Sequence, residues 1–175
     1  VIERSEGTRF IGDQVSLFQP LDMVLIGPNI PHLYRNNEVY YKRPGIGAKS
    51  IDIHFTDDFL GNSFFDVPEM KLVRRLLNRS NLALSVNGST REYVREQLYA
   101  MQELSPVKRL MKLLDILIVL STSKHLSNIL SQEFTVSNNK DAARIDIVFQ
   151  YILKNFRNEI YIEEIASRLN MSIGS

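Results

Sequence analysis

The stretch Ser50-Ile51-Asp52-Ile53-His54-Phe55 decides how the first half of this 175-residue chain is interpreted. Its apolar residues alternate with polar ones, which is typical of a β-strand with one buried face. Short runs rich in Val, Ile, Leu, Phe and Tyr precede it, and turn residues separate them. These runs are Phe10–Ile11, Val15–Phe18, Met23–Ile26, His32–Arg35 and Ala48–Phe55 itself. Several short strands at this spacing predict a β-barrel or sandwich.

Beyond Phe55 the apolar residues recur at helical spacing instead. Asp66, Pro68 and Glu69 predict a helix start. A short run at 82–86 predicts one strand that returns to the sheet. The capping box Ser89-Thr90-Arg91-Glu92 predicts the start of a second helix. Ser105-Pro106 ends that helix and begins a third one over Val107–Ser121, so the chain belongs to the α+β class.

The third predicted helix is apolar on nearly every side between Leu113 and Leu120, apart from Asp115. A helix of this kind needs partners on more than one face. With the preceding helix it forms a helical hairpin. Residue pattern alone leaves two interpretations open, a contact with a second subunit and the core of a single subunit.

The C-terminal part carries the most specific short motif. The polar stretch 135–142 predicts a linker, and helices are expected over residues 145–156 and Glu159–Leu169. Within the second of these, Ala166 is small enough for the close crossing of a helix-turn-helix, and Asn170 tolerates a left-handed turn. Ser172 could cap the following helix. The alternative is an ordinary helix that ends at Asn170 before a disordered tail.

Composition limits the classes of function. The net charge of +1 argues against a chain dominated by nucleic-acid or membrane electrostatics. The absence of cysteine excludes disulfides and thiolate metal sites and agrees with the cytoplasm. No secretory signal is seen, and the run Leu113–Leu120 is too short to span a bilayer. Basic and acidic residues cancel over Arg144–Ser175, so we expect these residues alone to bind DNA poorly.

Two segments resemble one family. Residues Arg144–Phe156 followed by Ile160–Ser172 resemble the opening of the AraC/XylS-type DNA-binding domain. Residues Gly12–His32, which end in Pro28-Asn29-Ile30-Pro31-His32, resemble the cupin-like sensor of the same family. Leu21 stands where such sensors usually carry glycine.

The resemblance implies an N-terminal cupin-like β-barrel or sandwich, a helical hairpin, and the first helices of a helix-turn-helix domain. The expected parts are an effector-sensing domain at 1–88, dimerisation helices at 89–134, a linker at 135–142 and a truncated DNA-binding domain at 143–175. Because the family has two helix-turn-helix units, we expect the chain to be a piece of a longer regulator, with its sensor also short at the N-terminus.

The implied function is a cytoplasmic, ligand-responsive, dimeric transcription regulator that is not an enzyme and needs no cofactor. Its partners would be operator DNA, a second copy, and a small effector such as a sugar or another polar metabolite, with no membrane. The resemblance favours the dimer interpretation of the third helix. The candidate dimer contacts are Leu113, Ile116, Leu117 and Leu120, and the candidate DNA contacts are Arg168 and Ser172.

His32 and Asn36 match the H-x-x-x-N spacing of the second cupin motif, in which the histidine ligates a metal. A metal needs three or four protein ligands, and only His54 and His125 remain as histidines, so we expect none. The candidate ligand-pocket residues are His32, Tyr34, Asn36 and His54. Purely structural roles at a strand edge or sheet surface remain open for all four. A cupin-type metal enzyme and a protein-interaction module without ligand remain as alternative functions.

Overall fold

A computed structural model describes residues 1–43, 45–133, 144, 147–148, 150–152, 154–155 and 159–172. The chain divides into two compact units, Val1–Phe134 and Thr135–Ser175, and each is described by itself. The class is α+β, as predicted.

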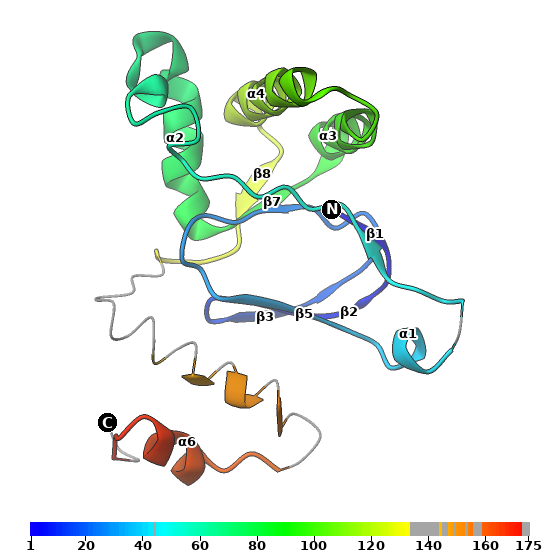
Figure 1. Cartoon of the computed structure of the whole chain (residues 1–175), viewed down its shortest axis with the longest axis vertical. Coiled ribbons are helices and arrows are strands. Elements are labelled where there is room, and N and C mark those ends of the chain that lie inside the picture. Colours follow the sequence, from blue (N-terminus) through cyan, green and yellow to red (C-terminus); the bar gives the residue numbers. More distant parts are fainter. Residues whose placement is uncertain are drawn as a thin grey trace. The chain divides into compact units, whose positions relative to one another are not determined.

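The strands of the first unit form three small antiparallel sheets (Figure 1). One sheet pairs β1 with β6, the second has the order β3-β2-β5, and the third has the order β4-β7-β8. The strands are β1 Ile2–Arg4, β2 Gly7–Ile11, β3 Gln14–Phe18, β4 Val24–Leu25, β5 His32–Asn36, β6 Lys49–Ser50, β7 Leu84–Val86 and β8 Leu126–Asn128.

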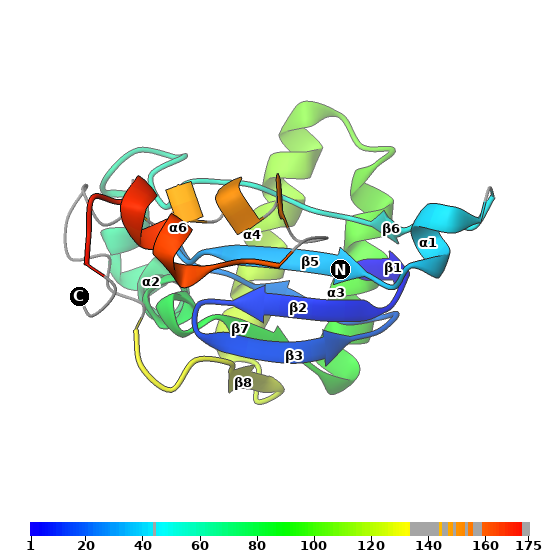
Figure 2. The same ribbon diagram turned by 90° about the horizontal axis from the view of Figure 1, so that it is seen from below.

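The sheet β3-β2-β5 is built on the central strand β2, and Figure 2 shows its three strands side by side. A tight turn with Gly12 at a φ of 56° joins β2 to β3, a conformation that suits glycine. Gly7 of β2 stands opposite Phe18 on one side and Asn36 on the other. The strands predicted at Phe10–Ile11, Val15–Phe18 and His32–Arg35 are therefore confirmed.

The predicted strand Ala48–Phe55 is shorter than expected. Only Lys49–Ser50 pairs in a sheet, with β1. Beyond Ser50 the segment continues without a ladder, yet its burial still alternates, and Ile51, Ile53 and Phe55 pack against the main core. The alternation predicted the buried face correctly, while strand pairing depended on a neighbour that the local pattern does not specify.

Three longer helices cover the strands on one side (Figure 1). They are α2 Lys71–Arg79, α3 Gly88–Met101 and α4 Pro106–Thr122, with α2 and α3 both packed on α4. The short helix α1 spans Val39–Lys42, and three single 3₁₀ turns are η1 Phe64–Asp66, η2 Pro68–Met70 and η3 Ser80–Leu82.

The predicted capping box at Ser89–Glu92 is wrong. Helix α3 begins earlier, at Gly88, with Asn87 in an extended conformation at the cap position and no side-chain capping bond. Thr90 is buried, and its hydroxyl shares a hydrogen bond of 2.7 Å with that of Ser123 beyond α4. A hydroxyl inside the predicted box, that of Thr90, thus ties the start of α3 to the end of α4.

The main core joins strands and helices into one cluster, so segments 1–88 and 89–134 share a single core. Its buried members are Met23, Phe65, Val73, Leu76, Leu77, Leu84, Val86, Val94, Leu98, Ile116, Leu117 and Leu120.

The predicted dimer contacts on the third helix are wrong, because this stripe of α4 lies inside its own subunit. Leu117 is 1% exposed, Ile116 and Leu120 are equally part of the core, and Leu113 is half-buried against it. The helix is apolar on several sides, so its sequence could not show which stripe packs against α2 and α3.

The second unit contains α6, Ile162–Arg168. Ala166 is buried, Asn170 has a φ of 53°, and the N–H of Met171 donates to the carbonyl of Ala166 at 2.9 Å. The predicted left-handed turn at Asn170 is confirmed. The described residues between 144 and 155 are helical, whereas the predicted linker 135–142 and the helix expected after Ser172 lie outside the described residues.

Candidate ligand-binding cavity

A cavity of about 800 Å³ lies inside the first unit. Its walls come from β5, the segment around β4, residues 48–57, the end of α2, and helices α3 and α4. This volume falls within the range of small-molecule sites in proteins, roughly 300–1,000 Å³. It is the candidate functional site.

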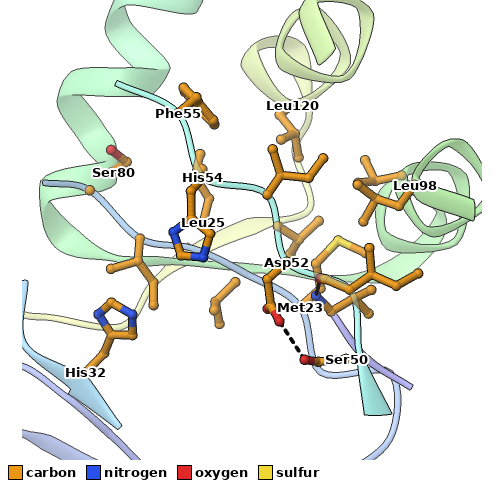
Figure 3. A pocket seen from close by; sticks show the side chains of 18 of the residues that line it. Met23, Leu25, His32, Ser50, Asp52, His54, Phe55, Ser80, Leu98 and Leu120 are labelled. Atoms are coloured by element: carbon orange, nitrogen blue, oxygen red, sulfur yellow. Dashed lines mark hydrogen bonds between the residues drawn. The ribbon is translucent and has the colours of Figure 1, made fainter. Parts of the chain in front are cut away.

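One wall of the cavity is polar and contains all four predicted pocket residues. His32, Tyr34 and Asn36 alternate along β5, so all three lie on the same face of the sheet and line the cavity. His54 lines it from the segment after β6. Figure 3 shows the His32 and His54 rings pointing into the same space from these two elements. The structure thus brings together residues more than twenty positions apart in the sequence.

The opposite wall is apolar and comes from the helices and β4. Its aliphatic side chains include Met23, Leu25, Val94, Leu98, Leu113, Ile116, Leu117 and Leu120. The four residues predicted as dimer contacts therefore line the cavity instead. The cavity therefore has two different walls, with hydrogen-bonding groups on the sheet side and hydrocarbon on the helix side.

The His32 ring is oriented by the loop that precedes its strand. Its Nδ1 lies 2.8 Å from the backbone carbonyl oxygen of Ile30. A carbonyl can only accept, so Nδ1 carries the proton, and in the neutral ring Nε2 is left as an acceptor. His32 therefore makes a hydrogen bond at the start of its strand and also lines the cavity.

A partly buried ion pair joins Arg9 to Asp22, which lines the cavity. Arg9 of β2 donates from Nη1 to Asp22 Oδ2 at 3.0 Å and from Nε to the Ser16 hydroxyl at 2.9 Å. Burial raises the pKa of Asp22, and the charge of Arg9 opposes this rise. Folding therefore disfavours the ionised Asp22, so its contribution to stability is fullest at low pH and is lost as pH rises through its pKa in the folded state. Burial likewise raises the pKa of Tyr34.

Asp52 is a cavity residue that sequence analysis did not single out. Its Oδ2 accepts a hydrogen bond of 2.5 Å from the Ser50 hydroxyl, and both residues line the cavity (Figure 3). The signal was present, because Ser50, Asp52 and His54 share one phase of the same alternating stretch. Of the three residues on that face, only His54 was predicted as a pocket residue.

Leu21 lies in the turn that directly precedes the cavity residues Asp22 and Met23. Leu21 has a φ of 76°, a left-handed conformation that residues with a side chain rarely adopt. Its N–H donates to the carbonyl of Ile2 at 2.8 Å, and the N–H of Ile2 donates back to the carbonyl of Asp22. The strained turn is therefore anchored to β1.

Replacing Leu21 with glycine is expected to stabilise the protein. Relief of the left-handed conformation returns about 1–2 kcal/mol, and the extra freedom of glycine in the unfolded chain removes roughly 0.5–1 kcal/mol of that gain. Urea unfolding followed by circular dichroism measures the difference. Leu17→Gly, in the extended strand β3, is the control and should destabilise. A Leu21→Gly protein no more stable than the original would contradict the strain at this turn.

The predicted DNA contacts lie in the second unit. The guanidinium of Arg168 stacks 4.7 Å from the centre of the Tyr151 ring, and the Tyr151 hydroxyl donates to Glu164. Ser172 follows the turn at Asn170. Arg168 thus has a structural role within its own unit.

Among the residues that the structure describes, no three His, Asp or Glu side chains gather closely enough to hold a metal ion. None of the described helices combines the length and the apolar character that crossing a membrane requires.

Compared with models of known protein families, with curated proteins and with solved structures, the chain matches none.

Proposed function

We propose that this chain is the effector-sensing and dimerising part of an AraC-type transcription regulator, a cytoplasmic protein without enzymatic activity of its own. The observation that carries the proposal is the cavity, in which His32, Tyr34, Asn36 and His54 meet although each was selected from sequence alone. A cavity of this size with a few convergent polar groups is the usual form of a small-molecule site.

Two local features support the resemblance to this family. Leu21 replaces the glycine that such sensors usually carry, and its backbone has a glycine-like positive φ. Asn170 makes the left-handed turn that a helix-turn-helix needs after its first helix. In this proposal the sheets around the cavity are the cupin-like sensor and α6 is the first helix of the helix-turn-helix.

The cavity suggests how an effector could act. Its lining includes Val94 and Leu98 of α3 together with Leu117 and Leu120 of α4, so a bound molecule would contact both helices directly. An effector that binds one arrangement of these helices more tightly than another shifts the equilibrium between them. Because the helices also carry the proposed dimer surface, the shift would reach the partner subunit.

The proposed dimer surface is the exposed stripe of α4, formed by Val107, Met111, Leu114 and Ile118. Val107 is 71% exposed, Met111 61% and Ile118 45%, and Leu114 is half-buried beside them. The spacing of four, three and four residues is that of a heptad seam, by which two helices pack together. A second copy of the chain is the partner that we propose.

Charges beside this stripe favour an antiparallel pairing of two copies. Lys108 and Asp115 lie one heptad apart on the same side of the seam. When the two helices run in opposite directions, Lys108 approaches the partner subunit's Asp115, and the symmetric contact repeats on the other side. In a single copy, Asp115 accepts from the Tyr93 hydroxyl at 2.9 Å and lies 3.7 Å from Lys112.

The proposed function is tested with the longer natural protein that would contain this chain. It is titrated against the DNA upstream of its own gene with excess non-specific competitor, beside the 175-residue chain. Tight, competitor-resistant binding is expected for the longer protein alone, because the basic and acidic residues of 144–175 cancel. If no specific binding occurs at moderate salt, the regulator proposal is abandoned in favour of a protein-interaction module.

A further inference from the structure

We infer that the cavity takes an organic cation with an apolar body, of which a short aliphatic amine is the simplest example. This inference rests on the proposed sensing function, because it names the chemical class of the effector. It follows from the charges of the lining, from the direction of its hydrogen bonds and from the hydrocarbon wall opposite.

The lining carries one carboxylate that the described residues leave without an ion pair. Three carboxylates line the cavity, those of Asp22, Asp52 and Asp57. Asp22 is paired with Arg9 at 3.0 Å, and Asp57 lies 3.8 Å from Arg74. Within the described structure, Asp52 has the Ser50 hydroxyl as its hydrogen-bond donor but no cation within ion-pair distance. Asp52 is therefore the lining carboxylate that no described cation neutralises within ion-pair distance.

Among the described residues, the lining carries a single lysine or arginine, Lys49, which makes no ion pair with this carboxylate. Lys49 lines the cavity, and its Nζ is held 5.8 Å from the centre of the Tyr99 ring. The α-ammonium group of Val1 also lines it and donates to the carbonyl of Ile51 at 2.7 Å. Burial lowers the pKa of this ammonium, and the charge of Asp52 is the largest effect that opposes the lowering. Asp52, the carboxylate that we propose binds the ligand's cation, thus stabilises the charged form of the Val1 ammonium.

Two histidines that line the cavity with Asp52 can accept a hydrogen bond from a ligand. His32 presents Nε2 as an acceptor, because its Nδ1 proton is directed to the carbonyl of Ile30. His54 has no hydrogen bond or ion pair to any residue that the structure describes, so its ring is available to a ligand. Figure 3 shows Asp52, His32 and His54 facing one cavity. An ammonium group has three donors and no acceptor, which complements these groups.

The apolar wall decides between an amine and a sugar. Met23, Leu98, Leu117 and Leu120 offer no hydrogen bond to a hydroxyl, and a sugar carries hydroxyls on every side. Burying those hydroxyls against hydrocarbon without partners is unfavourable, whereas an alkyl chain gains from each methylene that leaves water. An alkyl carboxylate would satisfy this wall but would place a second negative charge beside Asp52.

The test compares three probes that differ in the group they present. Hexylamine, hexanoate and galactose are each titrated into the protein at neutral pH, with binding read by calorimetry and by the shift in melting temperature. For these titrations a short leader is added before Val1, so that the Val1 nitrogen is an amide and supplies no cation to Asp52. Hexylamine is expected to bind and to raise the melting temperature, while hexanoate and galactose leave it unchanged.

Asp52→Asn is the deciding variant, and Asp58→Asn is its matched control. Asp58 is an exposed neighbouring carboxylate that does not line the cavity. Loss of the charge-assisted contact at Asp52 should weaken hexylamine binding about tenfold or more, and the Asp58 variant should bind as the original does. Both positions are exposed, so the fold should survive, which the melting temperature without probe verifies.

The remaining outcomes overturn the inference in distinct ways. Binding of hexanoate or galactose in place of hexylamine would reject the cation but leave a sensing cavity, and hence the proposed function, in place. Equal weakening by Asp52→Asn and Asp58→Asn would mean that general surface charge attracts the amine. Failure of all three probes would reject the ligand class. The DNA titration uses none of these probes, so a failure of the proposed function is distinguished from a failure of this inference.

Discussion

Leu117→Ala is expected to lower the free energy of unfolding by about 2–5 kcal/mol, the usual range for a buried leucine. Leu117 is 1% exposed and packs within the cluster that joins α2, α3 and α4. Its truncation removes hydrocarbon contacts that the surrounding helices can only partly restore. Urea unfolding of the purified protein, followed by circular dichroism, measures the loss. If Leu117→Ala lowered the free energy of unfolding by less than an ordinary surface substitution does, α4 would bury a different stripe.

The adjacent residue should behave in the opposite way. Ile118 is 45% exposed, so Ile118→Glu should change the free energy of unfolding by no more than about 0.5 kcal/mol. In the proposed dimer, however, it would bury a charge in the seam of Val107, Met111, Leu114 and Ile118, and the protein should become a monomer.

Light scattering coupled to size-exclusion chromatography distinguishes these effects. The original protein is expected to be a dimer and the Ile118→Glu protein a folded monomer. Val107→Glu, at the most exposed position of the stripe, should act in the same direction. An original protein that is monomeric at high concentration, or an Ile118→Glu protein that stays dimeric, would remove α4 from the dimer proposal.

Gly7→Ala is expected to be the most damaging single-methyl change in the sheet that carries the polar wall. A Cβ at Gly7 would lie 2.1 Å from the carbonyl oxygen of Arg35 and 2.9 Å from Cα of Asn36. These are backbone atoms of β5, so a side-chain rotation cannot relieve the contact. Overpacking of this kind costs about 1–3 kcal/mol and occasionally more. Since β5 must move, His32, Tyr34 and Asn36 should also lose their places in the cavity.

Gly47→Ala provides the matched control for this substitution. A Cβ at Gly47 would meet no heavy atom within 4 Å, so this alanine should leave stability nearly unchanged or raise it slightly. Urea unfolding gives the stability of both variants, and calorimetry with hexylamine reports whether the cavity keeps its shape. If Gly7→Ala matched Gly47→Ala in both measurements, the close approach of β2 to β5 would be disproved.

Local pattern was sufficient where an element carries its own periodic signal. The strands β2, β3 and β5 were predicted from short apolar runs bounded by turn residues, and the helix α4 from its Ser105-Pro106 start and its long apolar run. The left-handed turn at Asn170 was predictable for a similar reason, since few residues tolerate that conformation. The inward direction of Ile51, Ile53 and Phe55 likewise followed from their alternation with polar residues.

Features that depend on partners distant in sequence could not be predicted in this way. The strands β1 and β8 are three residues long and become strands only by pairing with β6 and β7. The hydroxyl of Thr90 bonds to that of Ser123 only because the fold brings the end of α4 to the start of α3. Each of these depends on which segments meet, and no local window contains that information.

The sequence by itself determined the class of the fold, the faces of its clearest strands and four side chains of the polar wall. Tertiary structure alone decided that Leu113, Ile116, Leu117 and Leu120 face inward, that Val107, Met111 and Ile118 face outward, and that Asp52 joins the two histidines. The physical reason is that periodicity reports how apolar a face is, whereas burial depends on what packs against it. On a helix that is apolar on several sides, only the positions of α2 and α3 distinguish the core from the surface.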